Sequence, residues 1–341
     1  MPLQSVKWVV LSAYWLTSAV MAAPLEPNCQ VIDLGDLPEG DHMSQATAIN
    51  ERGHVVGFSS GAESRYEAFW YAQRNMSSIS KSAPGGWSVA YAVNRSGQVV
   101  GVEDGVYAFR WQGGQKTRLE DLVGGSIFSV AYGLNDAGEA VGVCNDGVGI
   151  NSACKWPSGS ELPVRLDAGI YSSMAKDINN LGDVVGQDRM ITPFRDRAVL
   201  WPSGGGMVEL VAGNSIANAI NDEGVVVGNS EFGAFVWRAG QVQFLPSGSQ
   251  PSHYNDEALA VNRHGVVAGA ANWYGNKHAA LWVKGSLIRL ADYACVQQSG
   301  WTLYKATGIN DRGDIVGNGL NPAGFTAAFK IIRKTPPSQS E

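Results

Sequence analysis

The sequence is poor in charge and has no concentration of basic residues. Only 16% of its 341 residues are Asp, Glu, Lys or Arg, and no run of Lys or Arg occurs. Proteins that bind nucleic acid carry basic patches that neutralise phosphates, so nucleic acid is excluded as a partner. After residue 22 no apolar stretch is long enough to span a bilayer, and we expect no membrane insertion.

Signatures of metal and nucleotide chemistry are also missing. The five histidines form no His-Glu-x-x-His pair, and no phosphate-binding loop is present. We therefore expect no metal, no cofactor and no enzyme signature. What the chain does have is glycine, 42 residues of it, which together with the scarcity of charge indicates a soluble β-type protein.

The first 22 residues have the features of an export signal. Lys7 is their only charge, an apolar stretch follows it, and Val20 and Ala22 place small residues at the −3 and −1 positions of a cleavage site. A membrane anchor is the alternative, but the apolar stretch is too short to cross a bilayer. We expect cleavage after Ala22 and a secreted or periplasmic bacterial protein.

One pattern is repeated seven times at intervals of 41 to 48 residues. It is Ala-x-x-h-Asn-x-x-Gly-x-h-h-Gly, where h is apolar, followed after a variable gap by Ala-h-x-aromatic. Its asparagines are Asn50, Asn94, Asn135, Asn179, Asn221, Asn262 and Asn310. Self-similarity at such a period is typical of propellers and other repeat architectures.

Each part of the repeat predicts an element of structure. Ala-x-x-h predicts a short first strand, and Asn-x-x-Gly predicts a tight turn. The apolar pair that follows predicts a buried second strand, and Ala-h-x-aromatic predicts the third. A fourth, outer strand comes next, for example at 117–122. Four strands per repeat and no helical periodicity predict an all-β, seven-bladed propeller over residues 23–333, followed by a polar tail at 334–341.

The two ends of the repeat array predict how the ring closes. The seventh copy stops after its third strand at Ile331-Ile332, and an unpaired segment at 31–37 precedes the first copy. We expect this N-terminal segment to supply the fourth strand of the last blade, which would hide both edges.

Four cysteines in an exported chain predict two disulfides, for which three pairings are possible. Their positions in the repeat favour Cys144 with Cys154, which flank a loop between paired strands. The remaining pair, Cys29 with Cys295, would staple the closing strand to the region just past the outer strand of blade six.

The repeat and its Ala-Phe-x-Trp strands, as at 108–111 and 234–237, resemble the HAF repeat family of extracellular bacterial proteins. The opening at 33–40, Asp-Leu-Gly-Asp-Leu-Pro-Glu-Gly, is similar to the lead-in of that family. The resemblance covers nearly the whole chain after the signal. It implies export and a repeat fold, and it implies no activity.

Loop lengths indicate which face of the propeller recognises a ligand. The turn between strands one and two has constant length, whereas the gap from the second Gly to the Ala of strand three varies from 6 to 12 residues. Length variation in repeat proteins usually maps to the binding face. The ligand-binding candidates on that face are Arg65, Tyr66, Trp87, Arg189, Arg195, Glu231, Tyr254, Trp273, Tyr274 and Trp301. Aromatic rings beside charged groups suit recognition of sugars or peptides.

Two further patterns have competing interpretations. The acidic Asn-x-x-Gly turns resemble calcium loops, but their two central residues vary freely, which favours turns. No catalytic residue is identified; the candidates are His253, Asp256, Glu257 and His278, which neighbouring blades could bring together over the axis.

Three functional hypotheses follow. The favoured one is a monomeric, secreted binding module for an extracellular glycan or protein. The alternative is a propeller enzyme, a polysaccharide lyase or hydrolase, that acts on an extracellular polymer. A structural component of the cell surface or matrix is a third hypothesis.

Overall fold

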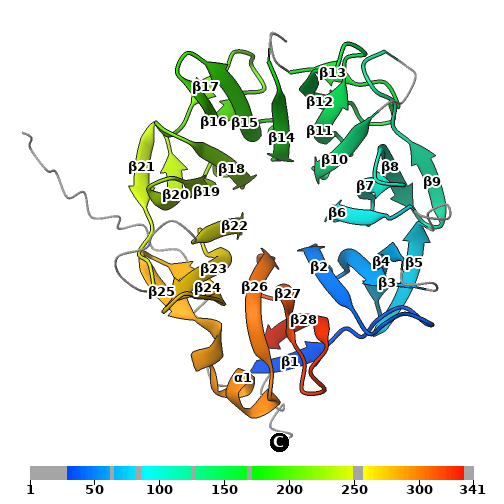
Figure 1. Ribbon diagram of the computed structural model, residues 1–341, viewed down its shortest axis with the longest axis vertical. Helices are drawn as coiled ribbons and strands as arrows, with labels where there is room; N and C mark the ends of the chain where they lie inside the picture. The colour runs from blue at the N-terminus through cyan, green and yellow to red at the C-terminus, as the bar shows by residue number, and fades with distance from the viewer. Residues whose placement is uncertain are drawn as a thin grey trace, which may run out of the picture.

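The computed structural model describes residues 29–61, 65–80, 86–123, 128–166, 171–248 and 256–333. Seven four-stranded antiparallel sheets are arranged as blades around one axis (Figure 1). This confirms the prediction of an all-β, seven-bladed propeller. The predicted signal peptide and the polar tail lie outside the described residues.

The blades share one strand order, from the axis outward. The innermost strands are β2 (Ser44–Ile49), β6 (Val89–Val93), β10 (Ser129–Leu134), β14 (Ser173–Ile178), β18 (Ser215–Ile220), β22 (Glu257–Val261) and β26 (Thr302–Ile309). The second strands are β3 (Val55–Ser60), β7 (Val99–Glu103), β11 (Ala140–Asn145), β15 (Val184–Ile191), β19 (Val226–Ser230), β23 (Val267–Trp273) and β27 (Ile315–Leu320). The third strands are β4 (Tyr66–Ala72), β8 (Tyr107–Gln112), β12 (Asn151–Trp156), β16 (Phe194–Trp201), β20 (Gly233–Arg238), β24 (Asn276–Val283) and β28 (Thr326–Arg333). The outer strands are β5 (Asn75–Ser80), β9 (Gln115–Arg118), β13 (Val164–Arg165), β17 (Val208–Glu209), β21 (Gln241–Phe244), β25 (Ser286–Arg289) and, in the last blade, β1 (Cys29–Asp33).

The two glycines of the repeat are required for different reasons. The first, such as Gly53, closes the Asn-x-x-Gly turn with a φ of 80°, in the left-handed region that favours glycine. The second, such as Gly57, lies where the innermost strand has a β-bulge, and a Cβ there would be 2.0 Å from the carbonyl oxygen of Gln45. Both features recur in every blade. The glycine spacing therefore records backbone geometry, not a ligand site.

The repeated asparagine joins each blade to the next. Its Oδ1 accepts N–H groups of its own turn, as Asn50 does from Arg52 and His54. Its Nδ2 donates to the backbone carbonyl of the equivalent asparagine in the following blade, at 2.8–3.2 Å, in all seven blades. The last of these bonds runs from Asn310 to Asn50, so the hydrogen bonds form a closed ring.

A buried serine makes a second contact between blades, which the sequence analysis did not predict. The hydroxyl oxygen of Ser88 accepts the N–H of Ala68, in the third strand of the preceding blade, at 2.8 Å. The same bond is made by Ser44, Ser129, Ser173 and Ser215. Each serine lies six residues before the ring asparagine, so the signal was present in the repeat.

Ring closure occurs as predicted. Strand β1 pairs antiparallel with β28 in the last blade, where Val31 faces Ile331 (Figure 1). A disulfide joins Cys29 of β1 to Cys295, and a second joins Cys144 of β11 to Cys154 of β12. Both predicted pairings are confirmed.

Two local expectations were wrong. Cys295 lies in a short α-helix, α1 (Ala294–Ser299), which follows a 3-10 turn, η2 (Leu290–Asp292), although no helix was predicted. Six residues are too few to show helical periodicity. The outer strand expected at 117–122 is instead β9, because a two-glycine turn starts the strand at Gln115; the N–H of buried Leu119 makes one more bond to the carbonyl of Ala108. Among the described residues no helix is long and apolar enough to cross a membrane.

We predict that Asn94→Asp destabilises the propeller. The substitution keeps the Oδ1 acceptor but removes the Nδ2 donor to Asn135, and it leaves a carboxylate beside a carbonyl in a buried position. We expect a loss of about 2–3 kcal/mol in the free energy of unfolding, measured by chemical denaturation. The exposed Asn75 offers a control, and equal effects of Asn94→Asp and Asn75→Asp would contradict the role of the ring.

We also predict that the two disulfides differ in what they contribute. Cys29 and Cys295 are 266 residues apart, whereas Cys144 and Cys154 are 10 apart. Because a longer loop loses more entropy on cross-linking, removal of the first pair as Cys29→Ser/Cys295→Ser is expected to cost about 5 kcal/mol and removal of the second about 3 kcal/mol. Denaturation of both double variants tests the order, which a larger loss at Cys144–Cys154 would overturn.

Candidate functional site

The strand order divides the propeller into two faces. The turn face carries the turns between strands one and two and between strands three and four. The variable face carries the loops between strands two and three and the connections between blades. The predicted ligand-binding residues that the structure describes belong to the loops and strand ends of the variable face.

An aromatic cluster lies on the variable-face side of the inner strands in blades one to four. It consists of Phe58, Tyr91, Phe128, Tyr132 and Met174, packed on buried valines. The ring centroids of Tyr91 and Tyr132 are 4.9 Å apart. Burial raises the pKa of Tyr91 to about 12, so its phenol stays protonated at physiological pH. These residues were not among the candidates named from the sequence.

Polar residues stand at the position of Met174, five residues before the ring asparagine, in blades six, seven and one: Glu257, Lys305 and Gln45. Glu257 of β22 receives hydrogen bonds from Lys277 of β24 and from Lys305 of β26, the latter at 2.6 Å. Burial opposes ionisation of Glu257, but the two lysines outweigh it and lower the pKa of the carboxyl. Asn318 of β27 donates to Gln45 of β2 at 3.4 Å. The variable-face side of the inner strands is therefore mainly aromatic in blades two and three and polar in blades six and seven.

A groove of about 280 Å³ opens beside the aromatic cluster, between blades three and four. Its lining residues are Phe128, Tyr132, Val143, Asn151, Ser172, Ser173, Met174, Gln187, Arg189 and Asp196. Arg189 Nε is 2.8 Å from Asp196 Oδ1, so the cation and the carboxylate are paired within the groove. The groove thus combines aromatic walls with amide, guanidinium and carboxylate groups, the composition expected of a ligand site.

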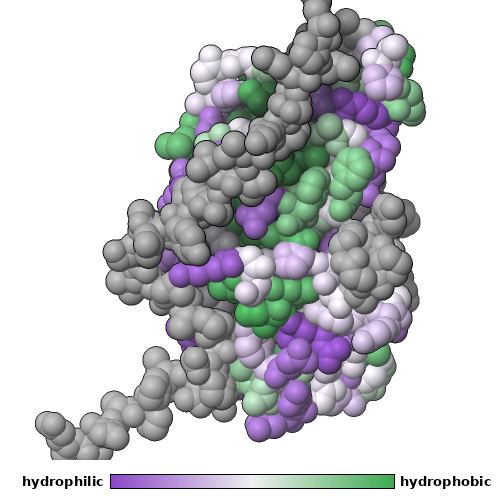
Figure 2. Space-filling model, turned by 90° about the vertical axis from the view of Figure 1, so that its left-hand side faces the viewer, coloured by the Kyte–Doolittle hydropathy of each residue, from purple (hydrophilic) through white to green (hydrophobic). Residues whose placement is uncertain are grey.

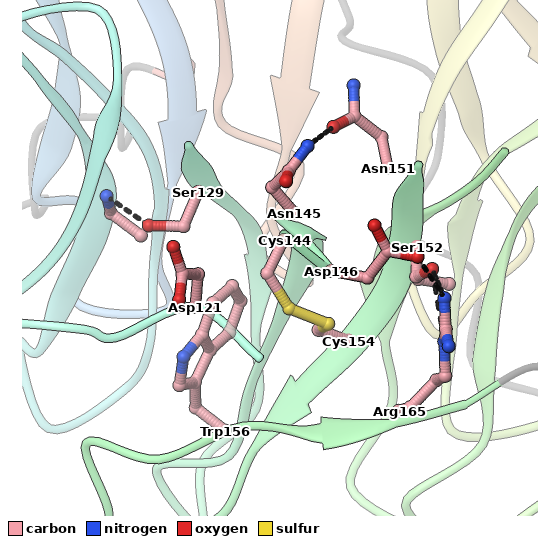
Figure 3. The surroundings of a disulfide bond; sticks show 12 residues. Asp121, Ser129, Cys144, Asn145, Asp146, Asn151, Ser152, Cys154, Trp156 and Arg165 are labelled. Carbon is pink, nitrogen blue, oxygen red and sulfur yellow. Dashed lines mark hydrogen bonds and ion pairs between the residues drawn. A yellow bond between two sulfur atoms is a disulfide. The ribbon is translucent and has the colours of Figure 1, made fainter. Parts of the chain in front are cut away.

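The disulfide Cys144–Cys154 braces one wall of this groove (Figure 3). Beyond it, the side chains of Asn145 and Asn151 are joined by a 3.1 Å hydrogen bond at the end of the β11–β12 hairpin. Asn151 lines the groove, so the covalent bond and the amide pair hold one of its polar groups in place.

The structure places the ligand-binding candidates in different surroundings, and not in one site. Arg189 lies in the groove. In the neighbouring loops Arg195 pairs with Glu209 at 2.6 Å, and Glu231 accepts the N–H of Asn214. Both of these side chains therefore hold loops in position.

The remaining candidates lie on other blades. Tyr66 meets Phe58 edge to face at 5.5 Å, and Trp87 packs against Gly105. Arg65 accepts a backbone hydrogen bond from Gly61. In blade six Trp273 contacts His278, and Tyr274 is 92% exposed.

Trp301 is buried against Phe329 at 6.0 Å, in the core of the closing blade. Tyr254 lies outside the described residues.

The catalytic candidates are engaged in structural contacts where they are described. Asp256 is buried and accepts the N–H of Asn272, and Glu257 is held by its two lysines. Burial, with Arg289 nearby, lowers the pKa of His278, which packs on Trp273. His253 lies outside the described residues.

One string, Gly57-Phe58-Ser59-Ser60-Gly61, matches the Gly-x-Ser-x-Gly pattern of serine hydrolases, against our expectation of no enzyme signature. Ser59 is fully buried inside β3 and not on an exposed strand-to-helix turn. Its hydroxyl accepts the N–H of Leu37 and donates to the carbonyl of Met43. Ser59 therefore fastens the lead-in segment to blade one.

The turn face holds a larger cavity, which lies on the axis. It measures about 460 Å³ and is lined by residues of all seven Asn-x-x-Gly turns. We interpreted these turns as structural, and the asparagine ring supports that interpretation, yet the same residues enclose the cavity. Among the described residues no three His, Cys, Asp or Glu side chains are placed to hold a metal ion.

The side of the molecule that carries β21 includes hydrophobic surface (Figure 2). An open hollow of about 430 Å³ there is lined by Leu210, Val211, Ala212, Phe232, Val242 and Phe244. Among the described residues no polar side chain lines it to orient a ligand, and the groove of blades three and four is the better candidate.

Between the two faces, β14 places an unusual carboxyl group beside the axis. Asp177 occupies a position where the other blades have Ala or Gly, and it accepts the N–H groups of Ile178 and Ile220 at 2.9 Å. Burial nevertheless raises its pKa to about 6, and burial also lowers the pKa of the adjacent Lys176.

Because its pKa is raised in the folded protein, Asp177 contributes stability below about pH 4 that is lost as the pH rises through 6. Asp177→Asn removes this dependence, since an amide stays neutral. We expect the free energy of unfolding of the variant minus that of the native chain to be larger at pH 8 than at pH 4 by roughly 2 kcal/mol. The substitution is therefore more stabilising, or less destabilising, at pH 8. Denaturation at both pH values measures this, and an equal effect at each would contradict it.

No protein-family model and no curated protein matches the chain. Solved structures are similar in fold. A puromycin-hydrolysing peptidase from Mycobacterium tuberculosis matches 90% of this chain with a TM-score of 0.53 and 11% identity, and the match spans 52% of that protein. A putative TolB from Agrobacterium tumefaciens matches 77% of this chain and 94% of its own, with a TM-score of 0.49 and 13% identity. A gluconolactonase from Xanthomonas campestris matches 90% of each chain, with a TM-score of 0.46 and 10% identity. At these identities the similarity concerns the fold alone.

Proposed function

We propose that this protein is an exported binding module that recognises an extracellular glycan in the groove between blades three and four. The observation that carries the proposal is the meeting of Phe128 and Tyr132 with amide and charged groups in one groove. Sugar rings present apolar faces that stack on aromatic side chains and hydroxyl groups that bond to amides and carboxylates.

The size of the groove agrees with recognition of part of a polymer. At about 280 Å³ it is smaller than the pockets that enclose drug-sized ligands, which begin at roughly 300 Å³. A single sugar unit of a longer chain fits such a groove, with the rest of the chain lying over the variable face. The neighbouring aromatic cluster supplies further contact area in that direction.

Export of the protein is supported by three observations. The N-terminal segment has the features of a signal peptide, and two disulfides suit an oxidising compartment. The repeat also resembles that of the HAF family.

We predict that Tyr132→Ala weakens glycan binding about tenfold, because it removes an aromatic wall of the groove. A glycan array probed with the intact chain identifies a ligand, and calorimetry compares the variants. Gln187→Ala removes a polar lining group without touching the aromatic cluster, and it is expected to weaken binding as well. Tyr274→Ala in blade six is the control and should bind like the native chain.

Four outcomes would contradict the proposal. The first is unchanged affinity in both groove variants, and the second is loss of binding only in Tyr274→Ala. The third is cleavage of the bound glycan into products, since that result would establish the enzymatic alternative. Binding of a protein and of no glycan would likewise overturn the choice of ligand class.

A further inference from the structure

The axial cavity of the turn face is built in three layers. Its floor is a ring of seven aliphatic residues, each preceding a ring asparagine: Ile49, Val93, Leu134, Ile178, Ile220, Val261 and Ile309. The seven turns form its wall. Its rim is formed by the residues that follow the asparagines, Glu51, Arg95, Asp136, Asn180, Asp222, Arg263 and Asp311. An apolar base therefore lies under a charged rim.

The rim residues form a second ring of hydrogen bonds between blades. The N–H of Arg95 donates to Asp136 at 2.8 Å, and the N–H of Asp136 donates to Asn180 at 2.8 Å. Equivalent bonds run from Asn180 to Asp222, from Arg263 to Asp311 and from Asp311 to Glu51. Each carboxylate of the rim thus accepts a backbone N–H from the preceding blade.

This second ring is interrupted at two places. Among the described residues, the N–H groups of Glu51 and Asp222 have no acceptor, because the next blade carries an arginine, Arg95 or Arg263, where the other blades carry Asp, Glu or Asn. By the geometry of the other bonds, each of these N–H groups points toward the arginine position. Two donors, a backbone amide and a guanidinium, therefore face the same space.

The two interruptions are not equivalent. Arg263 Nε is 3.4 Å from Asp311 Oδ2, so that guanidinium already has a carboxylate partner. Arg95 is exposed, and its guanidinium makes no hydrogen bond or ion pair with any described residue. The site between blades one and two is thus the one with donors available for an anion.

We propose that the axial cavity binds a small carboxylic acid with an aliphatic body, whose carboxylate lies between Arg95 and the N–H of Glu51. A guanidinium and a backbone N–H are the donors that carboxylates prefer. The body of the ligand would lie on the aliphatic floor, of whose seven residues Ile49, Val261 and Ile309 are partly exposed. Five carboxylates also line the cavity: those of Asp136, Asp222, Asp311 and Glu51, each of which accepts a backbone N–H of the preceding blade, and that of Glu223.

Three probes separate the contributions of the acid group and the body. Hexanoate carries both, acetate carries only the acid, and 1-hexanol carries only the body. Binding is followed by NMR with labelled isoleucine δ1-methyl groups, of which Ile49, Ile178, Ile220 and Ile309 report on the floor. The buried Ile331 in the closing blade reports on folding away from the cavity. We expect hexanoate to shift the floor methyls and to bind more tightly than either partial probe.

Arg95→Gln tests whether the guanidinium of Arg95 binds the carboxylate of the ligand. It is expected to weaken hexanoate about tenfold and to leave the spectrum of the free protein unchanged. Arg52→Gln makes the same charge change on an exposed arginine of the turn face that does not line the cavity, and it should bind like the native chain.

The proposal is overturned if hexanoate leaves the floor methyls unshifted, or if Arg95→Gln binds hexanoate as tightly as the native chain does. Equal binding of hexanoate and 1-hexanol would also overturn it, because the anion would then contribute nothing. The floor methyls lie on the face opposite the glycan groove, so this result is independent of the proposed glycan recognition.

Discussion

The closed ring of asparagine hydrogen bonds is the interaction on which the rest of the molecule depends. Each asparagine uses its Oδ1 to cap its own turn and its Nδ2 to reach the carbonyl of the next blade, so one side chain sets both the local turn and the blade-to-blade spacing. Because the seventh bond returns from Asn310 to Asn50, the blades can neither spread nor slip separately. A short polar side chain is needed for both bonds in a buried position, which explains why no other residue stands there.

The asparagine ring fixes backbone positions that are the same in every blade, while the residues beside it differ from blade to blade. With the asparagines fixed, the residues beside them on the chain are held at equal intervals around the axis, whatever their identity. The aliphatic residues before them become a floor and the polar residues after them become a rim. On the other face the inner strands hold Tyr132 and Met174 next to loops of differing length, and the groove of blades three and four results. Both candidate sites are consequences of one scaffold that tolerates variation between its fixed points.

Much of the fold could be predicted because the same local sequence pattern occurs seven times. A single turn pattern such as Asn50–Gly53 occurs in many folds, but its recurrence at the length of a propeller blade indicates a propeller. The disulfide pairs and the closing strand followed from register alone. The sites were harder to predict, since Trp301, an exposed-looking loop aromatic in the sequence, is buried in the core, whereas Tyr132 lies within a strand and lines the groove. Exposure of an aromatic residue depends on which neighbour covers it, and the neighbour belongs to another blade.

The sequence by itself determined the number of blades, the order of their strands, the seam and the two disulfides, because these depend on short-range patterns and on counting. Only the tertiary structure decided which side chains meet across blades. Arg95 and Glu51 are 44 positions apart, and the bond from Asp311 to Glu51 spans 260. Such contacts arise from ring closure, which brings every turn to the same axis, and no local pattern records which partner each residue will find there. For that reason the interrupted rim, and Arg95 without an ion-pair partner among the described residues, became visible only in the folded propeller.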